Sequence, residues 1–256
     1  MTAAPAVHVV EHNALAYRRA WRGTLTGVVS PFLFLGAMGW GLGTLVSRHT
    51  GDVSGVDYLT FLAPGLLAAT AMQTGALAGM WPILGNVRWT RLYDAMLATP
   101  LGVDDILVGE VVWIGVRLLF FSSIFFVAMV AFGTVVSPWG LLAVPAAVLT
   151  GVAFMTPITA FAATVRDATW FHLIHRLGLT PLFLLGGTFF PIGRLPGALQ
   201  AVAWATPLFH GVELTRDLTL GRPQLGVDIL HACVLAALFA AGVLAARVTF
   251  RRHLLQ

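Results

Sequence analysis

The chain has 256 residues, of which 58% are hydrophobic and only 10% are charged, with a formal net charge of +4 and a mean hydropathy of +0.85. Soluble domains carry about 25% charged residues, so this composition excludes a water-soluble fold and indicates a membrane protein. All 15 Lys and Arg residues are arginine, so neither a P-loop nor a Schiff-base enzyme can be built from this chain. The single cysteine, Cys233, excludes an internal disulfide and a cysteine-based metal cluster.

The chain divides into a polar N-terminal segment, a long apolar region and a short tail. Residues 1–24 mix apolar residues with histidine and arginine, which predicts a basic amphipathic helix on the inner leaflet, with a frayed tail as the alternative. Residues 249–256 form a cytoplasmic tail. One helical crossing of a lipid core about 30 Å thick needs roughly 20 apolar residues. Within residues 25–248, six stretches meet this length, at about 25–47, 58–84, 106–133, 139–165, 171–191 and 226–248.

The distribution of arginine predicts the orientation of these six spans, because cytoplasmic loops are enriched in basic residues. An even number of spans places both termini on one side. If that side is the cytoplasm, ten arginines lie in cytoplasmic segments and four in outer segments, with Arg117 left inside the third span. Both termini are therefore expected in the cytoplasm. The ten are Arg18, Arg19, Arg22, Arg88, Arg91, Arg166, Arg176, Arg247, Arg251 and Arg252, and the four are Arg48, Arg194, Arg216 and Arg222.

Charged residues inside a span are costly, and they are usually paired or functional. Glu110 and Arg117 lie seven residues apart in the third span, which places them on one helical face but too far apart for direct contact in most rotamers. Glu110 is nearly the only carboxylate that could carry protons through the bundle. The sequence therefore gives little support to a proton-driven carrier.

Motifs that suggest an enzyme have simpler interpretations. His172 and His175, with Asp167 nearby, supply too few ligands for a metal site. Their segment is more typical of a membrane interface, where polar groups meet lipid headgroups and an aromatic residue anchors the helix. Gly39 and Gly43 form a G-x-x-x-G pair within the first span, which predicts close helix packing, with a lipid-exposed helix as the alternative.

The fifth span is expected to break near the outer face of the membrane. Residues 186–192 read GGTFFPI, and non-helical backbone at this depth must be covered by protein or line a cavity. The apolar residues that follow predict a short re-entrant or interfacial helix. Further on, His210, Glu213 and Arg216 recur every three residues and can share one helical face. That face either contacts a polar headgroup leaving the pore or is simply solvated.

Three segments resemble the ABC type-2 exporter permeases. Residues 88–101, RWTRLYDAMLATPL, followed by DILVGE at 105–110, resemble the cytoplasmic loop of that family. Residues 58–65, YLTFLAPG, lie at the outer start of the second span. Residues 187–196, GTFFPIGRLP, continue to PLFH at 207–210 and to Arg216. Together they look most like the branch containing the nodulation-factor (lipo-oligosaccharide) exporter permease, with the daunorubicin-exporter permeases nearby.

The resemblance implies an all-α, multi-pass permease of a bacterial cytoplasmic (inner) membrane. It implies a homodimer of six-helix permeases working with two copies of a separate ATPase chain, which binds ATP and Mg, while this chain holds no cofactor and binds no nucleic acid. A short cytoplasmic coupling helix, by position about residues 88–98, would dock into the ATPase; an ordinary positive-inside loop is the alternative. Glu110 would pair with an arginine of the loop or the ATPase, or would face water at the helix start. The coupling-loop residues are Arg88, Trp89, Arg91, Tyr93, Thr99, Pro100 and Glu110.

The resemblance also implies outer re-entrant elements that close the translocation path, and an amphipathic substrate that moves outward. That substrate is a drug or antibiotic, a lipid or a lipo-oligosaccharide, and the few polar residues within the spans favour a drug or a lipid. A self-sufficient secondary carrier or lipid scramblase is the alternative function. The outer-gate residues are Pro64, Gly65, Phe190, Pro191, Pro196, His210 and Arg216.

Overall fold

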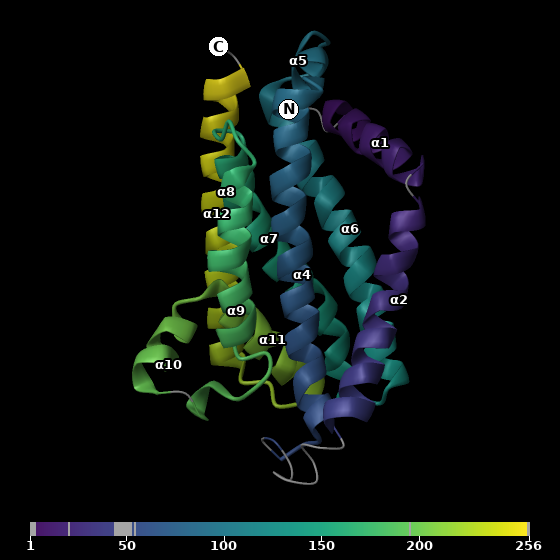
Figure 1. Ribbon diagram of the computed structural model, residues 1–256, viewed down its shortest axis with the longest axis vertical. Helices are drawn as coiled ribbons and strands as arrows, with labels where there is room; N and C mark the ends of the chain where they lie inside the picture. Colours follow the sequence, from purple (N-terminus) through teal and green to yellow (C-terminus); the bar gives the residue numbers. More distant parts are fainter. Residues whose placement is uncertain (1–3, 20, 44–52, 54, 195, 255–256) are drawn as a thin grey trace.

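The computed structural model of the chain is a bundle of helices in which the long elements run side by side (Figure 1). The structure describes residues 4–19, 21–43, 53, 55–194 and 196–254. Within these residues it contains no named strand, only an isolated bridge between Val53 and Val56. The all-α fold class predicted from the sequence is therefore confirmed.

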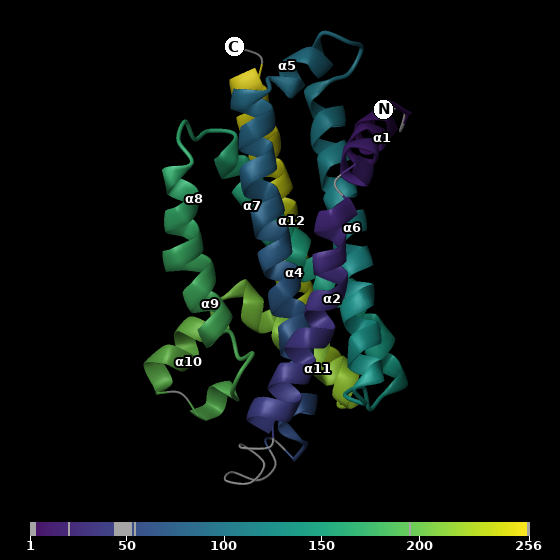
Figure 2. The ribbon, with the colours of Figure 1, turned by 45° about the vertical axis from the view of Figure 1, so that its right-hand side comes forward.

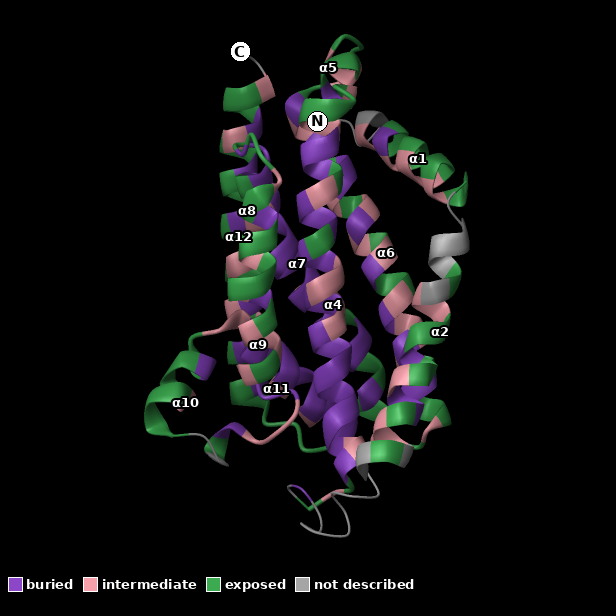
Figure 3. Cartoon of the chain, viewed as in Figure 1, coloured by how far each residue is buried: buried purple, intermediate pink, exposed green. Residues whose placement is uncertain are grey.

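Four helices in the described part of the chain are long and apolar enough to cross a membrane. The central one is α4, whose most apolar stretch is 78% buried inside the protein, whereas that of α12 is only 22% buried (Figure 3). The four are α4 (Tyr58–Leu84) with its continuation η2 (Gly85–Trp89), α6 (Val103–Ala131), α7 (Ala143–Ala162) preceded by η3 (Pro138–Leu142), and α12 (Leu225–Leu254).

Two further helical segments lie alongside these four in both views (Figures 1 and 2). The first is α2 (Trp21–Ala37), continued by η1 (Met38–Gly43), so the rest of the predicted span 25–47 lies outside the described residues. The second is the run α8 (Thr169–Leu173), η4 (Ile174–Leu179) and α9 (Thr180–Leu185). Both fall short of the four long helices in apolar length, so the count of six spans stays a prediction.

The fifth predicted span, 171–191, extends too far. Its helix ends at Leu185, because Gly187 adopts a left-handed backbone with φ of +81°, a conformation that glycine tolerates and that ends helices. The short elements η5 (Ile192–Arg194), α10 (Gly197–Trp204) and α11 (Pro207–Leu220) follow before the chain enters α12. The helix predicted after the break is present as α10.

The other end of the bundle carries both termini and the short helix α5 (Leu92–Leu97) (Figure 1). The N-terminal helix α1 (Ala4–Arg19) packs against α6, where its fully buried Val9 fits over Gly109. A methyl group on Gly109 would collide with Val9, so this close approach depends on glycine.

Glycine also sets the packing of the bundle core. A Cβ on Gly75 of α4 would run into the backbone of Gly151 on α7, so these two helices approach with almost no side chain between them. The sequence instead predicted close helix packing at Gly39 and Gly43. A Cβ on Gly39 would meet the side chain of Leu59, while the surroundings of Gly43 lie outside what the structure describes.

Candidate functional site

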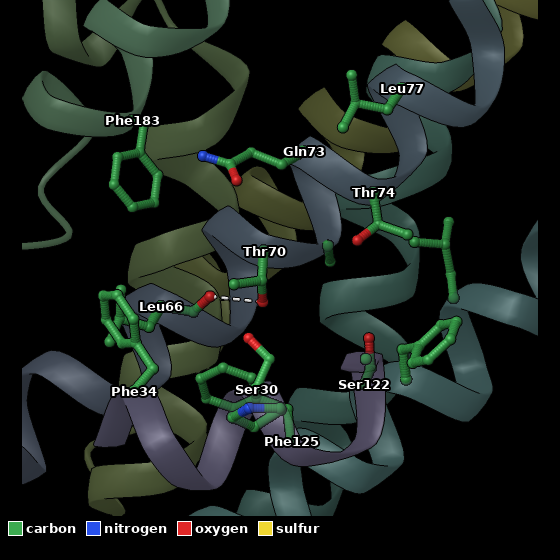
Figure 4. Close-up of a pocket in the computed structure, with 15 residues that line it drawn as sticks. Ser30, Phe34, Leu66, Thr70, Gln73, Thr74, Leu77, Ser122, Phe125 and Phe183 are labelled. Carbon is green, nitrogen blue, oxygen red and sulfur yellow. Dashed lines mark hydrogen bonds between the residues drawn. The ribbon is translucent and has the colours of Figure 1, made fainter. Parts of the chain in front are cut away.

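A cavity of about 360 Å³ opens between α2, α4 and α6, with Phe183 of α9 at its edge (Figure 4). It lies within the lengths of these helices and away from both ends of the bundle, since its residues come from the middle of each element. Its lining comprises Gly27, Ser30, Pro31, Phe34, Leu66, Thr70, Ala71, Gln73, Thr74, Leu77, Leu118, Phe121, Ser122, Phe125 and Phe183.

The lining combines aromatic rings with neutral hydrogen-bonding groups, and no charged residue belongs to it. Figure 4 shows the Gln73 amide directed toward Phe183, and the Ser30 and Ser122 hydroxyls directed toward α4. The hydroxyl of Thr70 is already used, because it donates to the backbone oxygen of Leu66 at 2.8 Å. Such a cavity suits an uncharged molecule that offers a ring or chain to the phenylalanines and hydrogen-bonding groups to the amide and hydroxyls.

The sequence interpretation did not identify this cavity. The signal lay in α4, where Thr70, Gln73 and Thr74 recur at positions i, i+3 and i+4 of an otherwise apolar helix and therefore share one face. That face could not be matched to its neighbours without knowing how α2 and α6 pack against it.

The coupling loop differs from the single helix predicted over residues 88–98. Helix α4 continues through Trp89 as the π-helical segment η2, so Arg88 and Trp89 belong to its end. Arg91 then adopts a left-handed backbone with φ of 48°, which separates η2 from the one-and-a-half-turn helix α5. Thr99 and Pro100 follow in the turn after α5. The side chain of Trp89 is 66% exposed, and Arg88 and Arg91 are exposed, so they are accessible to a partner chain.

Tyr93 anchors α5 to the bundle. Its fully buried hydroxyl donates to Oε1 of Glu110 on α6 at 3.1 Å and accepts from the side-chain amide of Asn86 at 3.4 Å, while its ring packs against Phe250 of α12. Burial, and then the charge of Glu110, raise the pKa of Tyr93 well above its ordinary value, so the hydroxyl stays protonated and remains a donor.

The interpretation that Glu110 faces water is wrong, because only 3% of this residue is exposed. Its carboxylate accepts the hydrogen bond from the Tyr93 hydroxyl, and pairing with an arginine of an ATPase chain stays a prediction. Arg117, seven residues further along the same face of α6, places its guanidinium 4.6 Å from the ring centroid of Tyr17 on α1.

A second connection at this end was not foreseen. Asp104, at the start of α6, accepts two hydrogen bonds from Arg247 of α12, at 2.8 and 2.7 Å, and one from Arg251 at 2.6 Å. Arg247 and Arg251 lie 143 and 147 positions after Asp104 in the sequence, so no local sequence pattern predicts these contacts. Together with Tyr93, they join α5, α6 and α12 at the end that carries the coupling loop.

At the opposite end, three of the predicted outer-gate residues meet. Arg216 of α11 is buried, donates to the backbone oxygen of Gly187 at 2.7 Å, and lies 4.0 Å over the ring of Phe61. The neighbouring Thr215 donates to the backbone oxygen of Pro64 at 3.0 Å. A Cβ on Gly65 would lie 3.0 Å from the backbone of Thr188 and 3.2 Å from the Arg216 guanidinium. This outer cluster ties α11 to α4 and to the break after α9.

The alternative of a solvated face through His210, Glu213 and Arg216 is wrong, since His210 is 6% exposed and Arg216 is 5% exposed. Glu213 forms an ion pair with Arg216. His210 lies with its Nδ1 2.6 Å from that of His231 on α12.

The other predicted outer-gate residues, Phe190, Pro191 and Pro196, lie in the segment between α9 and α10. Among the described residues, no hydrogen bond or ring contact joins them to Arg216. The sequence analysis did not predict the contact with His231, because this histidine is an isolated polar residue within an apolar helix.

The two histidines considered as metal ligands, His172 and His175, are both exposed. His172 is exposed and packs edge-on against Trp81, with ring centroids 5.3 Å apart. Among the residues that the structure describes, no group of three His, Cys, Asp or Glu side chains is placed to hold a metal ion.

Comparison with known proteins identifies the family. Residues 14–220 match the family described as "ABC-2 type transporter". The chain is 32% identical to Nodulation protein J of Rhizobium leguminosarum bv. viciae, over 97% of this chain and 94% of that protein. It is 28% identical to the Inner membrane transport permease YadH of Escherichia coli, over 67% of this chain and 66% of that protein. The chain is an integral membrane permease that belongs to the ABC-2 type transporter family.

Proposed function

We propose that this chain is the membrane subunit of an exporter that moves an amphipathic substrate outward across a bacterial cytoplasmic membrane. The cavity between α2, α4 and α6 is the observation that carries the proposal, because it offers neutral hydrogen-bonding groups and aromatic rings at mid-bundle. A separate ATPase chain supplies the energy and binds ATP and Mg, since this lysine-free sequence cannot form a P-loop. Two permease chains and two ATPase chains make up the complex.

The ATPase acts through the loop that contains α5. The exposed Arg88, Trp89 and Arg91 form its contact surface, and the buried Tyr93 passes the movement on to Glu110 of α6. Because α6 also lines the cavity through Leu118, Ser122 and Phe125, a shift at its inner end alters the cavity directly. The outer cluster around Arg216 holds α4, α11 and the break after α9 together, and so keeps the outer end of the translocation path closed until α6 shifts.

The cavity favours a substrate whose bound part is uncharged. A lipo-oligosaccharide would offer sugar hydroxyls to Gln73, Ser30 and Ser122, and a polycyclic antibiotic would offer a ring system to Phe34 and Phe125. The similarity to Nodulation protein J of Rhizobium leguminosarum bv. viciae supports the first of these classes, and the apolar majority of the lining residues supports the second.

The proposal is tested in proteoliposomes that contain this chain and its ATPase, with a lipo-oligosaccharide and an anthracycline as the two probes. One probe should stimulate ATP hydrolysis and accumulate on the far side only with ATP. Gln73→Leu should raise the probe concentration needed for half-maximal stimulation by roughly tenfold, the value of one lost hydrogen bond in a buried site. Thr70→Val is the matched control, because that hydroxyl already bonds to its own helix.

Two results would contradict the proposal. Equal effects of Gln73→Leu and Thr70→Val would show that the cavity does not contact the substrate. Transport by the chain alone, with an ion gradient or with none, would favour a secondary carrier or a scramblase.

A further inference from the structure

Two grooves share one wall, the side chain of Trp170: one lies at the turn between α7 and α8, and the other lies along α8 and η4. The first groove, of about 400 Å³, is lined by Phe161, Thr164, Val165, Arg166 and Trp170. The second, of about 320 Å³, is lined by Thr169, Trp170, His172, Leu173 and Arg176. Each groove therefore combines one guanidinium with the indole and with apolar side chains.

Neither arginine is neutralised by its surroundings. Arg166 and Arg176 are both exposed, and neither takes part in an ion pair among the residues that the structure describes. The adjoining helix α4 brings no counter-charge, because residues 58–93 include no acidic residue. His172, which also lines the second groove, adds ring nitrogens to this surface.

Asp167 is the sole acidic residue between positions 161 and 176, and its carboxylate is already engaged. One oxygen accepts from the backbone N–H of Thr169 at 3.0 Å and the other from the hydroxyl of Thr169 at 2.9 Å. These hydrogen bonds hold the pKa of Asp167 below its ordinary value. The carboxylate therefore binds the start of α8, and among the described residues it forms no ion pair with either arginine.

The geometry suits a molecule with an anionic head and a hydrocarbon chain. Arg176 of η4 and Thr169 of α8 line the same groove, and α8 lies toward the end of the bundle that carries both termini (Figure 2). Phe161 in the first groove and Leu173 in the second are exposed and present apolar surface to a hydrocarbon chain. Trp170, which is 53% exposed, lines both grooves, and tryptophan is enriched in the headgroup region of membranes.

We propose that the α7–α8 turn is a binding site for an anionic phospholipid, with its phosphate held by Arg166 and Arg176 on either side of Trp170 and an acyl chain lying along Leu173 or Phe161. Arginine binds phosphate oxygens through paired N–H groups, and basic pockets beside membrane helices recognise anionic headgroups. This site extends from the end of α7 through the turn and α8 to η4 and shares no residue with the cavity of Figure 4, so it goes beyond the proposed transport function.

The test uses the purified full chain in detergent, titrated with phosphatidylglycerol or phosphatidylcholine and followed by native mass spectrometry. The wild-type chain should retain phosphatidylglycerol in preference to phosphatidylcholine. Arg166→Gln and Arg176→Gln should each weaken this preference by roughly fivefold, and the double variant by roughly 25-fold, since one basic residue near an anionic headgroup contributes about that factor. Arg252→Gln, at an exposed arginine of α12, is the matched control and should change nothing.

Three outcomes would overturn the proposal. These are equal retention of the two lipids by the wild type, equal losses in Arg252→Gln and Arg176→Gln, and displacement of phosphatidylglycerol by inorganic phosphate alone. The last would show a phosphate site to which the apolar groove contributes nothing. Because all three substituted side chains are exposed, the variants should fold, and an unchanged circular dichroism spectrum checks that they do.

Discussion

Tyr93→Phe is the most informative single change in the coupling loop, because it removes one oxygen and leaves the ring against Phe250 in place. The carboxylate of Glu110, which is 3% exposed, would lose the donor that lies 3.1 Å away. A buried group deprived of its hydrogen bond costs about 1–3 kcal/mol, and the cost is at the upper end for a charged acceptor. We expect a loss of about 2 kcal/mol, which is roughly a thirtyfold change in the equilibrium that holds α5 on α6.

The loss should appear in two measurements. Unfolding of the purified chain in mixed micelles, titrated with dodecyl sulfate, should show the reduced free energy of unfolding. In the complex with the ATPase, basal hydrolysis should persist while its stimulation by substrate falls, because α5 would no longer transmit movement to α6. Tyr58→Phe is the matched control, since Tyr58 is also buried but donates no hydrogen bond among those described.

A double-mutant cycle with Glu110→Leu tests the physical reason. When both polar partners are removed, neither is left without its hydrogen bond. The double variant, Tyr93→Phe with Glu110→Leu, should therefore lose about 1–2 kcal/mol less free energy of unfolding than the two single variants lose in sum. Additive losses would refute the reasoning, because they would mean that the two side chains do not interact. A Tyr93→Phe variant that matched Tyr58→Phe in both measurements would refute it as well.

Three further substitutions test other parts of the structure. Arg216→Met should lower the free energy of unfolding by about 3–5 kcal/mol in the same micelle titration, because it leaves Glu213 without its ion pair and the Gly187 carbonyl without its donor. A loss below about 1 kcal/mol would contradict the contacts assigned to the outer cluster. Gly75→Val should abolish folded protein on size-exclusion chromatography, since its side chain would enter the backbone of α7, and a normal elution profile would contradict that packing. Burial, and then the charges of Glu213 and Asp228, raise the pKa of Asp217 to about 7, so the native state binds this proton more tightly than the unfolded chain and stability should fall as pH rises from about 4 to 7. Asp217→Asn should flatten that slope and raise stability at pH 8 by on the order of 1 kcal/mol, a value discounted for the partial exposure of the side chain; an unchanged slope would contradict it.

Sequence reasoning worked best where the signal is local. The second predicted span coincides with α4 because its start carries Asp57, whose side chain accepts from the Leu59 N–H, before a long apolar run. The break after α9 was visible because two adjacent glycines permit the left-handed backbone seen at Gly187. The family was recognisable for the same reason, since its motifs are short and contiguous.

The remaining features depend on which faces meet, and the sequence does not specify this. Arginine rarely adopts a left-handed backbone, so the sequence did not predict that Arg91 would divide the coupling helix. Arg216 looked like part of a solvated face, because a three-residue spacing identifies a face without saying what covers it. The contact between Tyr93 and Glu110 and the ion pair between Asp104 and Arg247 both join separate helices, so they follow from the packing of the bundle.

The most direct test of the proposed exporter is a comparison of two proteoliposome preparations, one with this chain alone and one with the chain and its ATPase. With ATP present, only the second should accumulate the lipo-oligosaccharide or anthracycline probe, and Tyr93→Phe should reduce that accumulation while Tyr58→Phe leaves it intact. Equal accumulation in the two preparations would contradict the central claim that this permease depends on an ATPase partner.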